Sequence, residues 1–141
     1  MIQNMTTVRK ITVRNTKIPL ELYVHIPFCV RKCQYCDFLS GPSDQKTRDA
    51  YVDALCREIR STSQKEAYEV VSVFIGGGTP SVFSGEQLCR IMDEIKQAFI
   101  LSEDAEITME ANPGTVSPEQ LKLCHEAGIN RISFGLQSTV Q

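Results

Sequence analysis

Four short apolar segments alternate with three longer segments of helical periodicity, and this alternation constrains the fold of the 141-residue chain more than any other feature. The apolar segments, rich in β-branched and aromatic residues, are residues 20–26, 70–75, 105–111 and 130–136. Regular alternation of strands and helices is typical of βα units, which build a parallel sheet. The sequence therefore predicts an α/β fold made of βα repeats with parallel strands.

The three helical segments each follow a residue suited to cap a helix. Ser43 or Asp44 precedes the first segment, Ser84 precedes the second over residues 85–98, and Ser117 with Pro118 precedes the third, which should stop at Gly128. One further cysteine falls in each helix beside apolar neighbours, namely Cys56, Cys89 and Cys124. A buried free cysteine behaves as a small apolar residue, so we expect these three in or near the core.

The other three cysteines, Cys29, Cys33 and Cys36, form a C-x3-C-x2-C triplet directly after the first apolar segment. A four-iron cluster is usually held by four cysteines, and a structural zinc ion by four protein ligands. Three thiolates therefore predict an iron–sulfur cluster with one coordination position open to another molecule. A zinc site with His25 as the fourth ligand is the alternative, and a disulfide is less expected because the count is odd.

Distinctive residues follow every predicted strand at its C-terminal end, where the ligand sites of parallel α/β folds lie. The triplet follows the first strand and the glycine run 76–78 with Thr79 follows the second, while Glu110 and Gln137 close the third and fourth. We expect one site, in which glycine N–H groups grip a small ligand. Glu110 would need a cationic or hydroxyl partner, and a tight turn or purely structural hydrogen bonds are the alternatives.

Composition and charge restrict the partners and the compartment. The net charge of -2 provides no broad basic patch, which argues against nucleic acid as the main partner, and no membrane span is present. Residues 1–15 are polar and basic without an apolar core, so no signal peptide is expected and the chain should be cytoplasmic with reduced thiols.

We expect a polar extension over residues 1–19 and a core over residues 20–141. A parallel sheet that stopped after its fourth strand would leave an unpaired edge, so we expect part of a longer protein, with a small open α/β domain as the alternative.

The motifs together resemble a known family. They are residues 23–29 (YVHIPFC), 35–38 (YCDF), 76–81 (GGGTPS), 110–113 (EANP) and 131–138 (RISFGLQS). This set is similar to the oxygen-independent coproporphyrinogen III oxidase-like radical S-adenosylmethionine (SAM) proteins, most closely to their heme chaperone branch. The resemblance runs from about Leu20 to the end and covers the first part of the family's length. It implies the N-terminal part of a partial TIM barrel.

The resemblance also implies cofactors and their contacts. Cys29, Cys33 and Cys36 would bind a [4Fe-4S] cluster whose fourth iron takes SAM. The expected contacts with SAM are made by Tyr23, Tyr35, Gly77, Gly78, Thr79, Glu110 and Gln137.

One position departs from the oxidase pattern. The oxidases have a further cysteine two positions after the third, whereas this chain has Phe38 there, as does the heme chaperone branch. The resemblance therefore implies a protein that binds heme and delivers it to heme-requiring enzymes, with the coproporphyrinogen oxidase reaction of porphyrin biosynthesis as the alternative.

Overall fold

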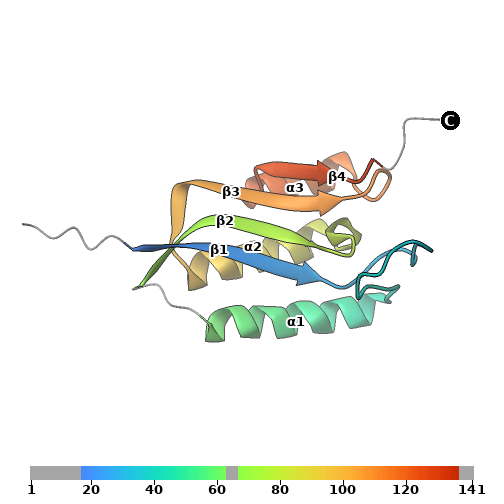
Figure 1. The fold of residues 1–141 in the computed structure, drawn as a ribbon, viewed down its shortest axis with the longest axis horizontal. Helices are drawn as coiled ribbons and strands as arrows, with labels where there is room; N and C mark the ends of the chain where they lie inside the picture. Colours follow the sequence, from blue (N-terminus) through green and yellow to red (C-terminus); the bar gives the residue numbers. More distant parts are fainter. Residues whose placement is uncertain (1–16, 63–66, 137–141) are drawn as a thin grey trace, which may run out of the picture.

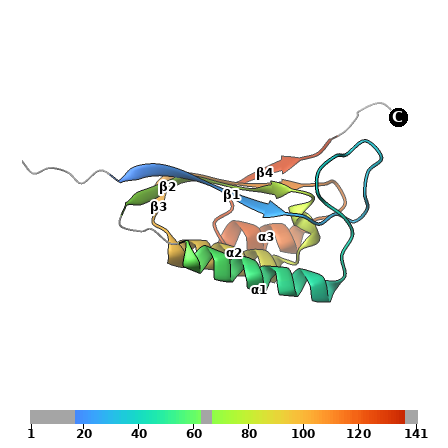
Figure 2. The ribbon, with the colours of Figure 1, turned by 60° about the horizontal axis from the view of Figure 1, so that its bottom comes forward.

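The computed structural model describes residues 17–62 and 67–136, which form one parallel four-stranded sheet in the order β1-β2-β3-β4. All strands point the same way in Figure 1, and Figure 2 shows the three α-helices together on one face of the sheet. The predicted α/β fold of βα repeats is confirmed. The elements are β1 (Ile18–Ile26), α1 (Gln45–Ser61), β2 (Tyr68–Gly77), the 3₁₀ turn η1 (Pro80–Val82), α2 (Gly85–Ala98), β3 (Leu101–Ala111), α3 (Pro118–Glu126) and β4 (Arg131–Phe134).

The core lies between the sheet and the helices. Side chains alternate across each strand, and the buried apolar positions of β2 and β3 that face the helices are Val73 and Ile75, and Ala105, Ile107, Met109 and Ala111. The fully buried members include Val73, Ile75 and Met109 from the sheet and Leu88, Ile91, Met92 and Ile95 from α2. Within residues 17–62 and 67–136 no helix covers the opposite face, and the aromatic and polar side chains described below lie on it.

Each helix begins at a predicted capping residue. Asp44 caps α1 by accepting a hydrogen bond from Thr47 N at 2.7 Å, and Ser117 accepts one from Gln120 N at 3.1 Å. Ser84 and Gln87 form a reciprocal capping box at α2. None of the helices within the described residues is long and apolar enough to cross a membrane.

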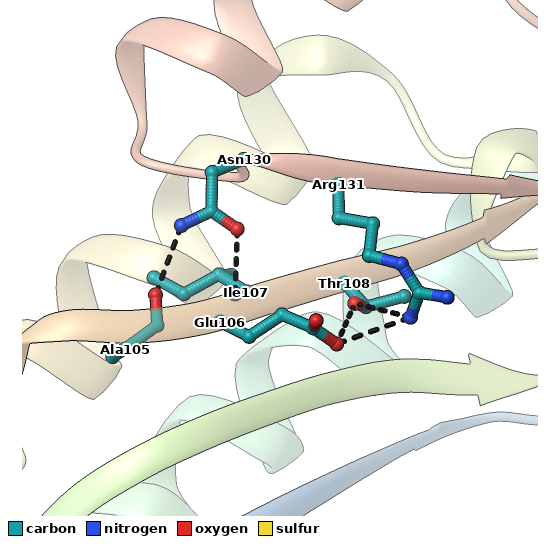
Figure 3. Close-up of polar contacts among 6 residues, drawn as sticks. All are labelled: Ala105, Glu106, Ile107, Thr108, Asn130 and Arg131. Atoms are coloured by element: carbon teal, nitrogen blue, oxygen red, sulfur yellow. Dashed lines mark hydrogen bonds and ion pairs between the residues drawn. The ribbon is translucent and has the colours of Figure 1, made fainter.

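Polar side chains fix the position of β4 beside β3 (Figure 3). The side-chain amide of Asn130 accepts a hydrogen bond from Ile107 N at 2.8 Å and donates one to Ala105 O at 2.9 Å. It thus makes the two hydrogen bonds to β3 that the backbone of a paired strand would otherwise make. On the helix-free face, Arg131 donates to Glu106 at 3.0 Å and to Thr108 at 3.3 Å. These contacts hold β4 in the register that pairs Glu110 with Ser133.

Some strand limits differ from the prediction. β2 continues through Gly76 and Gly77, and β3 starts at Leu101, ahead of the predicted Ala105. β4 ends at Phe134, two residues before the predicted Leu136. Glycine has a low intrinsic preference for strands, which is why the sequence placed the end of β2 too early.

Candidate iron–sulfur and SAM site

A cavity of about 710 Å³ opens at the C-terminal ends of the strands. The cysteine loop after β1, the glycine loop after β2 and the ends of β3 and β4 surround it. Most of the predicted site residues line it: Cys29, Cys33, Tyr35, Cys36, Gly77, Gly78, Thr79 and Glu110. Its volume lies in the range of small-molecule and cofactor sites. The structure thus brings these residues together around one cavity, and their roles at it stay predictions.

Among the described residues of the predicted set, Tyr23 does not line this cavity. Tyr23 lies on the helix-free face of the sheet, where its ring stacks on Phe74 with the centroids 6.1 Å apart, and it lines a smaller cleft together with His25. Gln137 lies outside the described residues. The contacts of both with SAM stay predictions.

The three cysteines of the loop are free thiols, with Cys33 exposed and Cys29 and Cys36 half-buried. Across residues 17–62 and 67–136, no three cysteine, histidine or acidic side chains gather closely enough to hold a single metal ion. A four-iron cluster makes a different demand, because each thiolate binds a separate iron and the three need not meet at one point. His25 lies apart from the triplet, with Nδ1 3.3 Å from the Tyr23 hydroxyl. The residues thus fit a cluster better than a zinc ion held with His25.

The N–H groups of the glycine loop are already used within the protein. Gly77 N donates to Glu110 Oε2 at 3.0 Å, Gly78 N to Ile26 O at 2.7 Å and Thr79 N to Phe28 O at 2.7 Å. The prediction that these N–H groups grip a ligand is therefore wrong. Their bonds attach the loop to the end of β1, to the cysteine loop and to Glu110.

Close packing explains why glycine occupies these positions. A Cβ atom on Gly78 would lie 2.4 Å from the Phe28 carbonyl oxygen. Gly77 has a positive φ of 113°, and the place of its Cβ atom is taken by the His25 ring at 2.5 Å. The lack of side chains lets β2 lie directly against the start of the cysteine loop and keeps the cavity floor open.

Glu110 receives a backbone N–H as its described partner, and not the arginine or hydroxyl that the sequence suggested. A Cβ atom on Gly76 would lie 2.7 Å from the Glu110 carboxylate, so this glycine makes room for it. The bond from Gly77 uses one carboxylate oxygen, Oε2. Within the described part of the chain the carboxylate keeps further acceptor sites for a ligand.

A buried polar atom in the cavity wall also lacks a partner. Ser40 lines the cavity, and its Oγ is buried without a hydrogen-bond partner within the described structure. Buried polar groups are normally satisfied, often by a ligand or an ordered water molecule. The cavity therefore fits a ligand that carries polar groups.

Sequence reasoning assigned no role to Asn112, although it follows β3 directly. Its Nδ2 donates to Thr79 Oγ1 at 3.0 Å, and the Thr79 hydroxyl lies 3.6 Å from Cys29 Sγ. Asn112 lines the cavity too. The signals for it in the sequence were its place before Pro113 at the end of a strand and its membership of the motif at residues 110–113.

The two sets of cysteines have different surroundings. A hydrogen bond with Cys33, and then the charges of Cys33 and Cys36, raise the pKa of the exposed Tyr35 above its usual value. Away from the cavity, burial and then the neighbouring Cys89 raise the pKa of the Cys124 thiol to about 11. Burial likewise raises the pKa of Cys56. The expectation that Cys56 and Cys124 belong to the core is confirmed, and Cys89 packs against it.

We expect iodoacetamide to alkylate Cys33 well before Cys124 in the native, cluster-free protein. The thiolate is the nucleophile, and a pKa of about 11 leaves about one thiol in a thousand ionised at pH 8. Because a raised pKa favours the neutral thiol, this protection holds below pH 11 and is lost as the pH rises through that value. Peptide mass spectrometry after timed labelling measures both rates. Equal rates for Cys33 and Cys124 in folded protein would contradict the packing described above, and unfolding in urea should abolish the difference.

Comparisons with known proteins agree with this geometry. The Radical SAM superfamily matches over residues 23–141. The heme chaperone HemW of Escherichia coli (strain K12) is 46% identical over 122 residues, which are 85% of this chain and 32% of that protein. HemW of Bacillus subtilis (strain 168) is 44% identical over 118 residues, 82% of this chain and 31% of that protein. The chain thus spans about a third of the length of these relatives. The solved structure of coproporphyrinogen III oxidase (HemN) from Escherichia coli, described as a radical SAM enzyme, superposes with a TM-score of 0.81 and 34% identity over 88% of this chain and 29% of that chain.

Proposed function

Because the chain belongs to the radical SAM superfamily, we propose that Cys29, Cys33 and Cys36 hold a [4Fe-4S] cluster at the cavity and that SAM binds beside it. The observation that carries this proposal is the shared cavity, which is lined by all three thiols, the glycine loop and Glu110. When bound and reduced, such a cluster supplies one electron to the sulfonium of SAM, which starts radical chemistry.

The residues of this chain bind and orient SAM. Gly77, Gly78 and Thr79 lie beside its methionine moiety, and the second carboxylate oxygen of Glu110 accepts a hydrogen bond from its ribose. Tyr35, which lines the cavity, contacts it from the cysteine loop. Tyr23 and Gln137 complete the contacts. Tyr23 is on the same face of the sheet as Glu110. Tyr23 pairs with Phe74 and Phe74 with Thr108, and Glu110 lies two residues after Thr108 in β3, where side chains return to the same face.

For the whole protein we propose a heme chaperone that binds heme and passes it to heme-requiring proteins. Phe38 supports this choice: it lines the cavity at the position where the oxidases have a further cysteine, and its side chain is an exposed apolar ring. A phenyl ring cannot ligate iron or exchange electrons or hydrogen as a thiol can. The relatives named heme chaperones support the same choice. Six free cysteines fit a reducing compartment, and we propose the cytoplasm.

The second candidate is oxygen-independent coproporphyrinogen III oxidation, which the structural likeness to HemN favours. The two functions predict different results for the full-length protein with a reconstituted cluster. We expect it to bind heme, detected by a change in the heme absorption spectrum. We also expect no conversion of coproporphyrinogen III under anaerobic conditions with SAM and a reductant. Conversion to protoporphyrinogen IX at the rate of a known oxidase assayed in parallel would make the oxidase the correct assignment.

A further inference from the structure

A hydrogen-bond chain links the loop after β3 to one of the cysteines. Asn112 Nδ2 donates to Thr79 Oγ1 at 3.0 Å, and the Thr79 hydroxyl lies 3.6 Å from Cys29 Sγ, within hydrogen-bond reach of a sulfur acceptor. Thr79 is only 4% exposed, so its hydroxyl has few alternatives to these two partners. The three residues come from three different βα loops.

The backbone of Asn112 is held on both sides. Its N–H donates to Ser81 Oγ at 3.4 Å, and its carbonyl accepts from the Thr115 hydroxyl at 2.7 Å and from Thr115 N at 3.1 Å. The Ser81 and Thr115 hydroxyls also contact each other. These bonds fix the amide of Asn112 relative to Thr79, although Asn112 itself is exposed toward the cavity.

The direction of these bonds determines where the threonine proton points. An amide NH₂ group can only donate, so the Thr79 oxygen must accept from Asn112. Its own O–H then remains free to donate, and the sulfur of Cys29 is the acceptor within reach. Without Asn112, the hydroxyl could rotate and donate elsewhere.

We propose that Asn112 is a positioning residue that directs the Thr79 hydroxyl proton to the Cys29 sulfur and thereby raises the reduction potential of the cluster. The inference rests on the proposed function, since it assumes a cluster on Cys29. Reduction adds negative charge to a cluster, and a hydrogen bond to a ligand sulfur stabilises that charge. Loss of the bond therefore lowers the potential.

The test is a double-mutant cycle on the full-length protein with a reconstituted cluster. Midpoint potentials are measured by anaerobic redox titration with EPR detection. We expect N112A and T79V each to lower the ratio of reduced to oxidised cluster about tenfold at a fixed applied potential, which is about 59 mV for a one-electron couple. N112A should add almost nothing in the T79V background, because its effect passes through the hydroxyl. T79S, which keeps the hydroxyl, should retain the wild-type potential.

Controls separate this inference from the function beneath it. T108V removes a buried threonine hydroxyl whose described partners are Glu106 and Arg131, and should leave the potential unchanged. If N112A does not assemble a cluster, N112D is used in its place. The change in midpoint potential that N112D causes in the T79V background measures the effect of the added charge alone, and this value is subtracted from the change that N112D causes in the wild-type background. Absence of a cluster from the wild-type protein would defeat the proposed function. Intact clusters with equal potentials in wild type, N112A and T79V, or additive shifts in the double mutant, would overturn the inference alone.

Discussion

Serine in place of Cys33 is expected to abolish the iron–sulfur cluster. The three cysteines of the triplet are all the protein ligands that we propose for the cluster. C33S leaves only two thiolates, and the serine hydroxyl is a poor ligand for this type of cluster. Iron and acid-labile sulfide after anaerobic reconstitution should fall from about four of each per chain to near zero. SAM binding should disappear with the cluster.

Cys89 provides the matched control. It lies on α2 with its thiol 3.5 Å from Leu123 O, so C89S makes the same chemical change away from the cavity. This variant should keep its iron and sulfide. Retention of both by C33S, with wild-type SAM binding, would show that the triplet does not hold the cluster.

Alanine in place of Gly78 is expected to weaken SAM binding by at least tenfold. The added Cβ atom would lie 2.4 Å from Phe28 O and 2.9 Å from Ile26 O, and both atoms belong to the backbone, so a side-chain rotation cannot relieve the contact. The loop must move away from β1, which breaks the bonds of Gly78 N and Thr79 N to these carbonyls. Small displacements of positioning groups have large effects on binding geometry.

Gly41 lies in the cysteine loop and supplies the comparison, because a Cβ atom there would meet nothing within 4 Å. Calorimetric titration of SAM into the reconstituted proteins under anaerobic conditions measures both affinities, with iron content and circular dichroism as checks on cluster and fold. We expect G41A to bind as the wild type does. Unchanged affinity in G78A would mean that the glycine loop does not shape the binding site.

The arrangement of strands and helices was predictable because burial leaves a periodic trace in the sequence. The capping residues Asp44, Ser84 and Ser117 marked where helices begin, and alternating apolar residues marked the strands. The position of the site followed from chain direction alone, since parallel strands bring their C-terminal ends to one edge. For this reason, the sequence alone predicts that widely separated residues such as Cys29 and Glu110 lie together, as they do at the cavity.

Hydrogen-bond partners were not predictable in the same way. Nothing in residues 76–79 indicates that their N–H groups donate to Ile26, Phe28 and Glu110, because these partners are set by how closely two loops approach. The contact from Asn112 to Thr79 likewise joins two loops that are far apart in sequence. Tyr23 precedes the triplet closely, but its ring stacks on Phe74 and does not line the cavity, so its contact with SAM stays a prediction.

The most direct test of the central claim is an EPR measurement on the reduced, reconstituted protein with and without SAM. A cluster held by three cysteines has one iron open to SAM, so binding of SAM should change the g values of the reduced [4Fe-4S] signal, and C33S should give no signal. An EPR signal that is identical with and without saturating SAM would contradict the account. Stoichiometric zinc without labile sulfide, in protein purified and reconstituted without oxygen, would contradict it too.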